Sequence, residues 1–368
     1  GTVSGATNGV YAQSYGAGAL SITTGAVTGA NGYGVFGYQS SYGTSLTIDT
    51  AAGAVSGNVG IGAQNGGSGA LSVTTAGVTG TAGNGIAAFN YGTDLSIDSS
   101  AGAVSGGTSG IYAGQYGTGA LTITTGAVTG TGVFGIRAYN SGSGTDLAID
   151  STGGAVIGGS VGIGAQNLGT GSLTIAGSDV TGGNGTGVYG YQGGAGTDLT
   201  IDTSAGTVSG ATNGVYAQSY GAGALSITTG AVTALGGNAI TAIAQAGTNG
   251  IAITTSGDVA GSALGIYALN NGSAPTVIVN DGSVTADTFE AIRTRGAGSQ
   301  ITNNGAITGS VSLSDADDTL TNNGAFNAVG DSTFGAGSDT LTNYTRTSGA
   351  TMTADAVADG GFPFKRDD

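Results

Sequence analysis

The chain has 368 residues, including 79 Gly but no Cys, His or Trp, and its formal net charge at pH 7 is −15. The missing Cys and His exclude a disulfide scaffold and nucleophilic catalysis of the Ser-His or Cys-His kind. The acidic balance disfavours nucleic-acid binding, and the chain has no apolar run of about 18 residues, so no transmembrane segment is predicted.

A repeat of about 26 residues organises the chain from its beginning. Residues 18–29, Gly-Ala-Leu-Ser-Ile-Thr-Thr-Gly-Ala-Val-Thr-Gly, return in varied form along most of the sequence. A fixed period of this size indicates a repeat architecture. The same slot of the repeat is held by Leu20, Leu46, Leu71, Leu95, Leu121, Leu147, Leu173, Leu199 and Leu225, and the column is expected to continue at Ile251 and Val277.

Each period contains three short strand signals separated by Gly-rich corners. In the period at 110–130 they are residues 110–113, 120–125 and 127–130. Apolar residues alternate with polar or aromatic ones in each, as in strands with one buried face. Because one period cannot bury its apolar side alone, stacked periods must form the core. The prediction is an all-β, right-handed parallel β-helix (β-solenoid) of 25–26 residues and three strands per turn, with roughly 12–13 turns.

The corners allow two further expectations. Sharp corners between flat faces are expected to need positive φ, which Gly adopts without strain. A polar position after the first strand is predicted to form an amide ladder along the axis, and the alternative is a solvent-exposed turn. The residues at this position are Gln39, Asn65, Asn90, Gln115, Asn140, Asn167, Gln192 and Asn270.

The pattern also predicts boundaries. Residues 1–309 are expected to be regular turns with a two-turn unit of about 51 residues, because Ile-Thr-Thr and Ile-Asp-Thr/Ser versions alternate. Residues 310–345 are predicted to be divergent C-terminal turns or a cap, and residues 346–368 a tail or linker. Since the chain opens within a repeat, it is expected to be a piece of a longer exported protein.

The alternation of Gly-Ile-Tyr-Ala at 110–113, Leu-Thr-Ile-Thr-Thr-Gly-Ala-Val-Thr-Gly at 121–130 and Asp-Asp-Thr-Leu-Thr-Asn-Asn-Gly at 317–324 resembles the passenger region of bacterial autotransporter (type V secretion) adhesins. The resemblance covers residues 1–345. It implies a right-handed β-helix displayed on, or released from, the bacterial outer membrane. The membrane barrel and linker helix of that family have no counterpart in this sequence.

The spacing of the acidic residues does not favour catalysis. Glycoside cleavage needs a close carboxylate pair, but the repeated carboxylates stand on alternate turns, about 10 Å apart. We therefore expect a non-enzymatic protein and a solvated face. The same alternation interrupts the Ser/Thr pairs that would otherwise suit ice binding. The repeated carboxylates are Asp49, Asp98, Asp150 and Asp202, with Asp94, Asp146 and Asp198 at the strand starts, and the Ser/Thr pairs are Ser21/Thr23, Ser72/Thr74, Thr122/Thr124 and Ser226/Thr228.

A calcium site is the sharper hypothesis for the acidic C-terminal segment. Carboxylates combined with carbonyl oxygens are the ligands that Ca²⁺ prefers. The candidate ligands are Asp315, Asp317, Asp318 and Asp339. No other cofactor is expected.

Outward aromatics are the feature most suited to recognition. They fall into two neighbouring columns and favour either partner contact, by sugar stacking or protein docking, or stacking between turns. One column holds Tyr11, Phe36, Tyr112, Tyr189, Tyr216 and Tyr267, and the other holds Tyr38, Phe89, Tyr139 and Tyr191.

The sequence thus predicts an extracellular structural or adhesive rod at a bacterial surface, with a role in adhesion or biofilm contacts. Its expected partners are a surface glycan, matrix, a host or neighbour-cell protein, or itself. The main rival is a self-assembling filament whose subunits stack end to end through open parallel edges. A calcium-binding surface repeat, an ice-binding solenoid and a glycan-cleaving enzyme are the lower alternatives.

Overall fold

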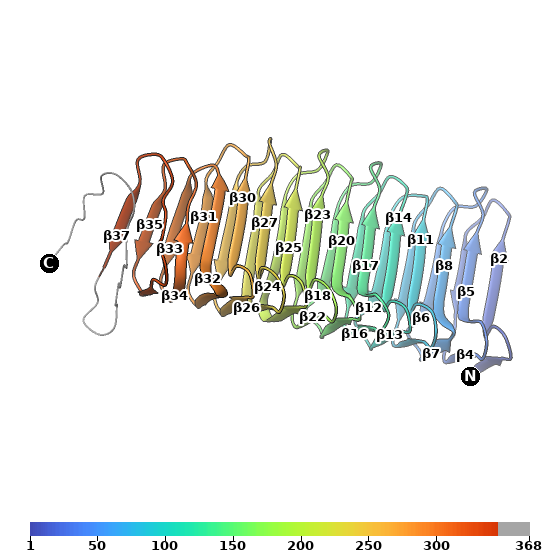
Figure 1. The fold of residues 1–368 in the computed structure, drawn as a ribbon. Coiled ribbons are helices and arrows are strands. Elements are labelled where there is room, and N and C mark those ends of the chain that lie inside the picture. Colours follow the sequence, from blue (N-terminus) through green and yellow to red (C-terminus); the bar gives the residue numbers. More distant parts are fainter. Residues whose placement is uncertain (345–368) are drawn as a thin grey trace.

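A computed structural model describes residues 1–344, which form a parallel β-solenoid of about 14 turns (Figure 1). All 37 strands belong to one sheet, and every strand pairing is parallel. The expected all-β solenoid is therefore confirmed. It has more turns than the 12–13 expected, because the divergent C-terminal segment winds in the same way. At about 4.8 Å per turn the described rod is about 65 Å long.

Each turn contributes strands to three faces. The strands of the first face are β2 (Val10–Ser14), β5 (Tyr33–Gln39), β8 (Val59–Asn65), β11 (Ile86–Asn90), β14 (Ile111–Gln115), β17 (Phe134–Asn140), β20 (Val161–Asn167), β23 (Val188–Gln192), β25 (Val215–Ser219), β27 (Ile240–Ala244) and β30 (Ile266–Asn270). Those of the second face are β3 (Leu20–Thr23), β6 (Leu46–Thr50), β9 (Leu71–Thr75), β12 (Leu95–Ser99), β15 (Leu121–Thr125), β18 (Leu147–Ser151), β21 (Leu173–Gly177), β28 (Ile251–Thr255), β31 (Thr276–Asn280), β33 (Ser299–Asn303), β35 (Thr319–Asn322) and β37 (Thr340–Asn343).

The third face is narrower, and four strands continue around a corner. The third-face strands are β1 (Val3–Gly5), β4 (Val27–Gly29), β7 (Val55–Gly57), β10 (Val78–Gly80), β13 (Val104–Gly106), β16 (Val128–Gly130), β19 (Val156–Gly158), β22 (Val180–Gly182), β29 (Asp258–Gly261) and β36 (Ala325–Asn327). Strands β24 (Leu199–Gly210) and β26 (Leu225–Ala234) join the second face to the third, and β32 (Ser283–Gly296) and β34 (Ala306–Ser312) join the third face to the first.

The core is made of the predicted apolar columns. Ile111, Leu121, Ile123 and Val128, one turn's contribution from all three faces, are completely buried. Each stacks on the equivalent residue of the turns before and after it, for example Leu121 between Leu95 and Leu147. Full burial of such a side chain is worth roughly 1.5–3 kcal/mol, so the columns hold the turns in register.

The leucine column ends one step earlier than expected. Ile251 pairs with Thr276, which is buried, whereas Val277 pairs with Ala252 and lies on the outer side. The expectation for Val277 was wrong because this turn is one residue shorter than the 26 counted. In a strand, a shift by one residue moves a side chain to the opposite face.

The corner glycines act by close approach rather than by positive φ. In residues 1–344, positive φ occurs only at glycines from Gly247 onward and at Phe289. In the regular turns a side chain would instead clash with the preceding turn. A Cβ on Gly117 would lie 1.7 Å from the carbonyl oxygen of Gly92, and a Cβ on Gly92 would lie 2.0 Å from that of Gly69. The conformational argument for these corners was therefore wrong, and tight stacking explains them.

The polar position after the first strand is buried, not solvent-exposed. Asn65 donates to Asn90 Oδ1 over 2.9 Å and Asn140 donates to Asn167 Oδ1 over 3.0 Å, so part of the predicted amide ladder is present. Most of these amides also donate to corner carbonyls of their own turn, as Asn65 does to Gly69. They therefore tie the corner to the strand as well as one turn to the next.

A second amide ladder, which the sequence reasoning missed, runs through the C-terminal turns. Asn280, Asn303, Asn322 and Asn343 lie at the end of the second-face strands, and each of the first three donates to the next over 2.6–2.7 Å. Successive turns are shorter here, since Gln300 pairs with Thr319. Strand β34 crosses the expected boundary at residue 310, and the predicted tail, 346–368, lies outside the described residues.

No helix occurs in residues 1–344, and accordingly none there is long and apolar enough to cross a membrane.

Candidate ligand-binding face

The outward side of the first face carries most of the aromatic side chains. The side chains of its strands alternate between core and solvent, and Tyr112 of β14 points outward. Gly114, two residues on, holds the second outward position and is covered by the rings of Tyr116 and Phe89. Parallel pairing brings these positions into two columns. The ten aromatics predicted from the sequence occupy these columns, and all are exposed or partly exposed.

The rings group into three aromatic clusters along the face. The first cluster is Tyr11, Tyr15, Tyr33, Phe36 and Tyr38; the second is Phe89, Tyr91, Tyr112, Tyr116 and Tyr139; the third is Tyr189, Tyr191, Tyr216 and Tyr220. Stacking between turns is present in each, with ring centroids 4.9 Å apart for Tyr11–Phe36 and 5.1 Å apart for Tyr91–Tyr116. Since the rings remain partly exposed, this stacking is compatible with contact to a partner.

Two glycine-containing strands separate the clusters. Strands β8 and β20 have the same sequence, Val-Gly-Ile-Gly-Ala-Gln-Asn, with Gly62 and Gly164 at an outward position. Aromatic rings of the preceding turn lie over both glycines: a Cβ on Gly62 would be 2.6 Å from Tyr33, and one on Gly164 would be 3.0 Å from Phe134. These glycines therefore give the rings a surface on which to lie.

All three basic side chains within residues 1–344 are also on this face. Arg137, Arg293 and Arg295 occupy the outward columns of β17 and β32. Arg137 lies over the Phe134 ring, 5.4 Å from its centroid, a cation–π arrangement. Arg293 is paired with Glu290, whereas Arg295 donates to the carbonyl of Leu313 over 3.3 Å.

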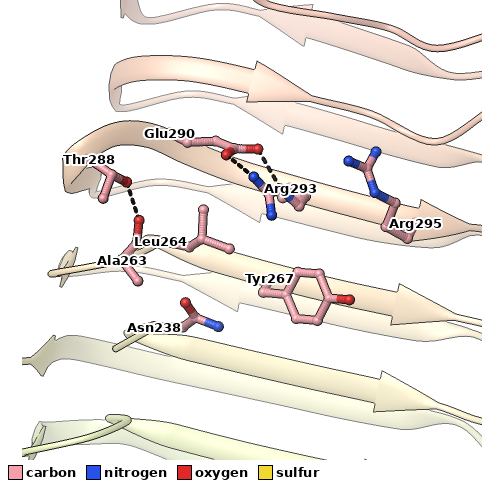
Figure 2. A pocket seen from close by; sticks show the side chains of 8 residues that line it. All are labelled: Asn238, Ala263, Leu264, Tyr267, Thr288, Glu290, Arg293 and Arg295. Atoms are coloured by element: carbon pink, nitrogen blue, oxygen red, sulfur yellow. Dashed lines mark hydrogen bonds and ion pairs between the residues drawn. The ribbon is translucent and has the colours of Figure 1, made fainter. Parts of the chain in front are cut away.

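Two clefts open beside these arginines. The larger, about 510 Å³, is lined by Asn238, Ala263, Leu264, Tyr267, Thr288, Glu290, Arg293 and Arg295 (Figure 2). The smaller, about 260 Å³, lies beside the second cluster and is lined by Asn84, Thr108, Ser109, Tyr112, Val133, Phe134 and Arg137. We call them the distal cleft and the central cleft. Both are within reach of solvent and combine a ring, an amide and a guanidinium.

The backbone around the distal cleft is irregular. Pairing between β32 and β34 shifts register on either side of Glu290, and Phe289 has a φ of 67° with an exposed side chain. A bulky residue in the left-handed region costs energy, and such positions cluster at functional sites. The bulge carries Thr288 and Glu290 onto the edge of the cleft, as Figure 2 shows.

The surroundings keep three phenols and one guanidinium of this face in their ordinary charge states at neutral pH. Partial burial raises the pKa of Tyr116, Tyr189 and Tyr216, so their hydroxyls stay protonated. The hydrogen bond from Arg293 to Glu290 raises the pKa of that guanidinium further. The face therefore offers neutral phenols and positive guanidinium groups.

The repeated carboxylates bond to backbone instead of pairing with each other. Asp98 accepts from the hydroxyl and also from the backbone N–H of Ser100, and these hydrogen bonds lower its pKa. Asp146 accepts from the backbone N–H of Ser172 in the next turn over 2.7 Å. Asp49, Asp150 and Asp202 likewise accept from the backbone N–H two residues further on. Asp94 and Asp198, like Asp146, accept from a backbone N–H of the next turn. These acids shape corners and connect turns.

The second face retains the interrupted array expected for its Ser/Thr pairs. Asp98 lies between Thr74 and Thr124 of the neighbouring turns. A carboxylate thus stands on every second turn of this column up to Asp202, which does not suit an ordered layer of ice-like water.

The four calcium candidates do not converge on one point. Asp318 is buried and accepts from Ser299 and Ser314, Asp339 accepts from the backbone N–H of Asp318, and Asp317 accepts from that of Ser338. Asp315 is exposed. Within the described residues no group of three or more acidic, His or Cys side chains is placed to hold a metal. Calcium binding stays a prediction.

Sequence reasoning missed a third aromatic column and the arginines. Tyr91, Tyr116 and Tyr220 each follow directly after the buried polar position, and Tyr15 follows the half-buried Ser14 at the same place in its turn, so the repeat spacing contained the signal. The three arginines do not recur at the spacing of the repeat, so the sequence gave no periodic signal for them. Their placement on one face follows only from the register of the turns.

Comparison of the chain with protein-family models, with curated proteins and with solved structures found no match.

Proposed function

We propose that the chain is a non-enzymatic adhesive rod, displayed on or released from a bacterial surface, that contacts glycans, matrix or neighbouring-cell proteins through its first face. The observation that carries the proposal is the restriction of the three aromatic clusters and all described arginines to one face. Exposed aromatic rows are typical of surfaces that contact partners. The bacterial setting follows from the resemblance to autotransporter passengers.

The rest of the molecule supports a passive role. The uninterrupted hydrophobic core makes a stiff scaffold on which the face is held flat. The repeated carboxylates are engaged by backbone N–H groups and are spread evenly, so none is set apart as a general acid or base. The first face therefore recognises without transforming what it binds.

Adhesion of purified protein to glycan arrays and matrix-coated surfaces tests the proposal. Replacing Tyr91 and Tyr116 by Ser removes the most exposed stacked pair of the second cluster and is expected to reduce adhesion at least fivefold. The matched control replaces Thr122 and Thr124 by Ala, on the second face of the same turn, and should adhere like the parent. Circular dichroism confirms that both variants fold.

Equal adhesion of the two variants would contradict the proposal. Electron microscopy of the same preparations distinguishes it from the filament alternative. Short isolated rods are expected, whereas long fibres with an axial repeat of one molecule would favour a self-assembling subunit.

A further inference from the structure

We propose that the central and distal clefts are two sites built on the same register, each of which binds a carboxylate-bearing sugar residue of an acidic polysaccharide. The inference rests on the proposed function, since it assigns a ligand class to the same face. It also extends that function, because it assigns a negatively charged ligand to the two parts of the face where arginines lie, one of which shares Tyr112 with the second cluster.

The likeness of the two clefts is a matter of register. In the central cleft an Asn, a Tyr and an Arg come from three successive turns: Asn84 precedes β11, Tyr112 is in β14 and Arg137 is in β17. The distal cleft repeats this order with Asn238 before β27, Tyr267 in β30 and Arg293 in β32. Tyr112 and Arg137 are direct neighbours in the ladder, as are Tyr267 and Arg293. The two sets are six turns apart, about 29 Å along the axis.

Each cleft contains one guanidinium that forms no ion pair within residues 1–344. In the central cleft this is Arg137, which lies against Phe134. In the distal cleft the register counterpart of Arg137 is Arg293, which Glu290 neutralises. The unpaired charge there comes instead from Arg295, two residues further along β32. A guanidinium can bind a carboxylate through two parallel hydrogen bonds. The net charge of −15 opposes the approach of an anion at long range, so binding at these sites depends on short contacts with the two guanidinium groups.

The remaining lining groups favour a sugar over an acidic peptide. The Tyr ring beside each arginine offers a flat apolar surface for the C–H face of a pyranose. Asn84 in the central cleft and Asn238 in the distal cleft each add an amide to the lining, a group that exchanges hydrogen bonds with sugar hydroxyls. The volumes are about 260 Å³ for the central cleft and about 510 Å³ for the distal cleft, enough for one or two small polar units such as sugar rings. Neither cleft has the deep apolar pocket that a peptide anchor side chain would need.

Isothermal titration calorimetry with trigalacturonate as the probe tests the inference on the full chain. The parent is expected to bind two molecules of the trimer, each of which is too short to bridge the clefts. Arg137→Gln and Arg295→Gln should each reduce the stoichiometry from two to one, and the double variant should not bind. Gln166→Ala, at an outward position of β20 on the same face but outside both clefts and all three clusters, is the matched control and should retain both sites.

Methyl-esterified trigalacturonate and a tri-glutamate peptide are the comparison probes. Both are expected to bind at least tenfold more weakly than trigalacturonate. The inference is overturned if the ester binds equally well, if the peptide binds equally well, or if neither arginine variant changes the stoichiometry. Neutral glycans that bind the aromatic clusters regardless of the arginine substitutions would leave the adhesive function standing while the acidic-sugar sites fail.

Discussion

Asp318 shows how the C-terminal turns differ from the rest of the rod at the level of single residues. Its side chain is 1% exposed and accepts hydrogen bonds from Ser299 and Ser314. Burial raises its pKa to about 6, and nearby Asp339 adds to the rise, although the hydrogen bonds oppose it. The other acids discussed for the regular turns are exposed or half-buried corner residues.

This raised pKa predicts that the C-terminal turns weaken as pH rises from about 4 to about 6. The unfolded carboxyl ionises near pH 3.9, so between the two values the folded state holds the extra proton and unfolding becomes easier as pH increases. The shift corresponds to a loss of about 2 to 3 kcal/mol, complete above pH 6. Hydrogen exchange of the β35 and β37 amides, corrected for intrinsic pH effects, measures it.

Asp318→Asn should remove this pH dependence, because an amide resembles the protonated carboxyl and keeps an acceptor for Ser299. Asp315→Asn, an exposed neighbour, is the matched control and should leave the dependence unchanged. The same slope in the parent and in Asp318→Asn would show that another group is responsible.

At the scale of the strand and its corner, close stacking sets the tolerance to substitution. A Cβ at Gly117 would lie 1.7 Å from the carbonyl oxygen of Gly92, whereas a Cβ at Gly142 would meet nothing nearer than 3.9 Å. Both glycines are in corners that follow a first-face strand. The corner positions are therefore unequal despite their similar composition.

Gly117→Ala is predicted to destabilise the protein by about 1–3 kcal/mol, because the backbone must move apart to admit the methyl group. Gly142→Ala should change stability by less than about 0.5 kcal/mol in the absence of contact. Urea denaturation followed by circular dichroism compares them. Equal midpoints would mean that these corners are loosely packed.

The sequence predicted the strands and columns well, because a two-residue alternation within a fixed period leaves little freedom for the register. Leu121 and Tyr112 lie where the repeat places them. Prediction failed at Val277, where one missing residue reversed the face, and at the corners, where contacts between turns rather than φ select Gly. The clefts could not be predicted, because each combines single residues from three turns that only stacking brings together.

For the whole molecule, interactions between neighbouring turns make its length adjustable. Each turn packs mainly on the one before and the one after it, as in other solenoids. Leu121, Leu147 and Leu173 occupy the same position in three successive turns. Removing residues 121–172 would therefore place Leu173 directly after Ala120, in the position that Leu121 normally holds.

This deletion is expected to fold into a rod two turns, or about 10 Å, shorter, with a melting temperature within a few degrees of the parent. Small-angle X-ray scattering measures the length. The control deletion, residues 121–173, removes one more residue, brings Thr174 into the buried slot and should not form a stable solenoid. If both deletions behave alike, register is not what holds the turns together.

The glycine strands β8 and β20 have a consequence for long ligands. They space the aromatic clusters at intervals of roughly three to four turns, about 15–20 Å. A flexible polymer held at one cluster presents its next segment to the neighbouring cluster at high effective concentration, so avidity grows without new chemistry. Shortening the rod by whole repeats would then lower its avidity for polymers, while its affinity for a single sugar unit would stay unchanged.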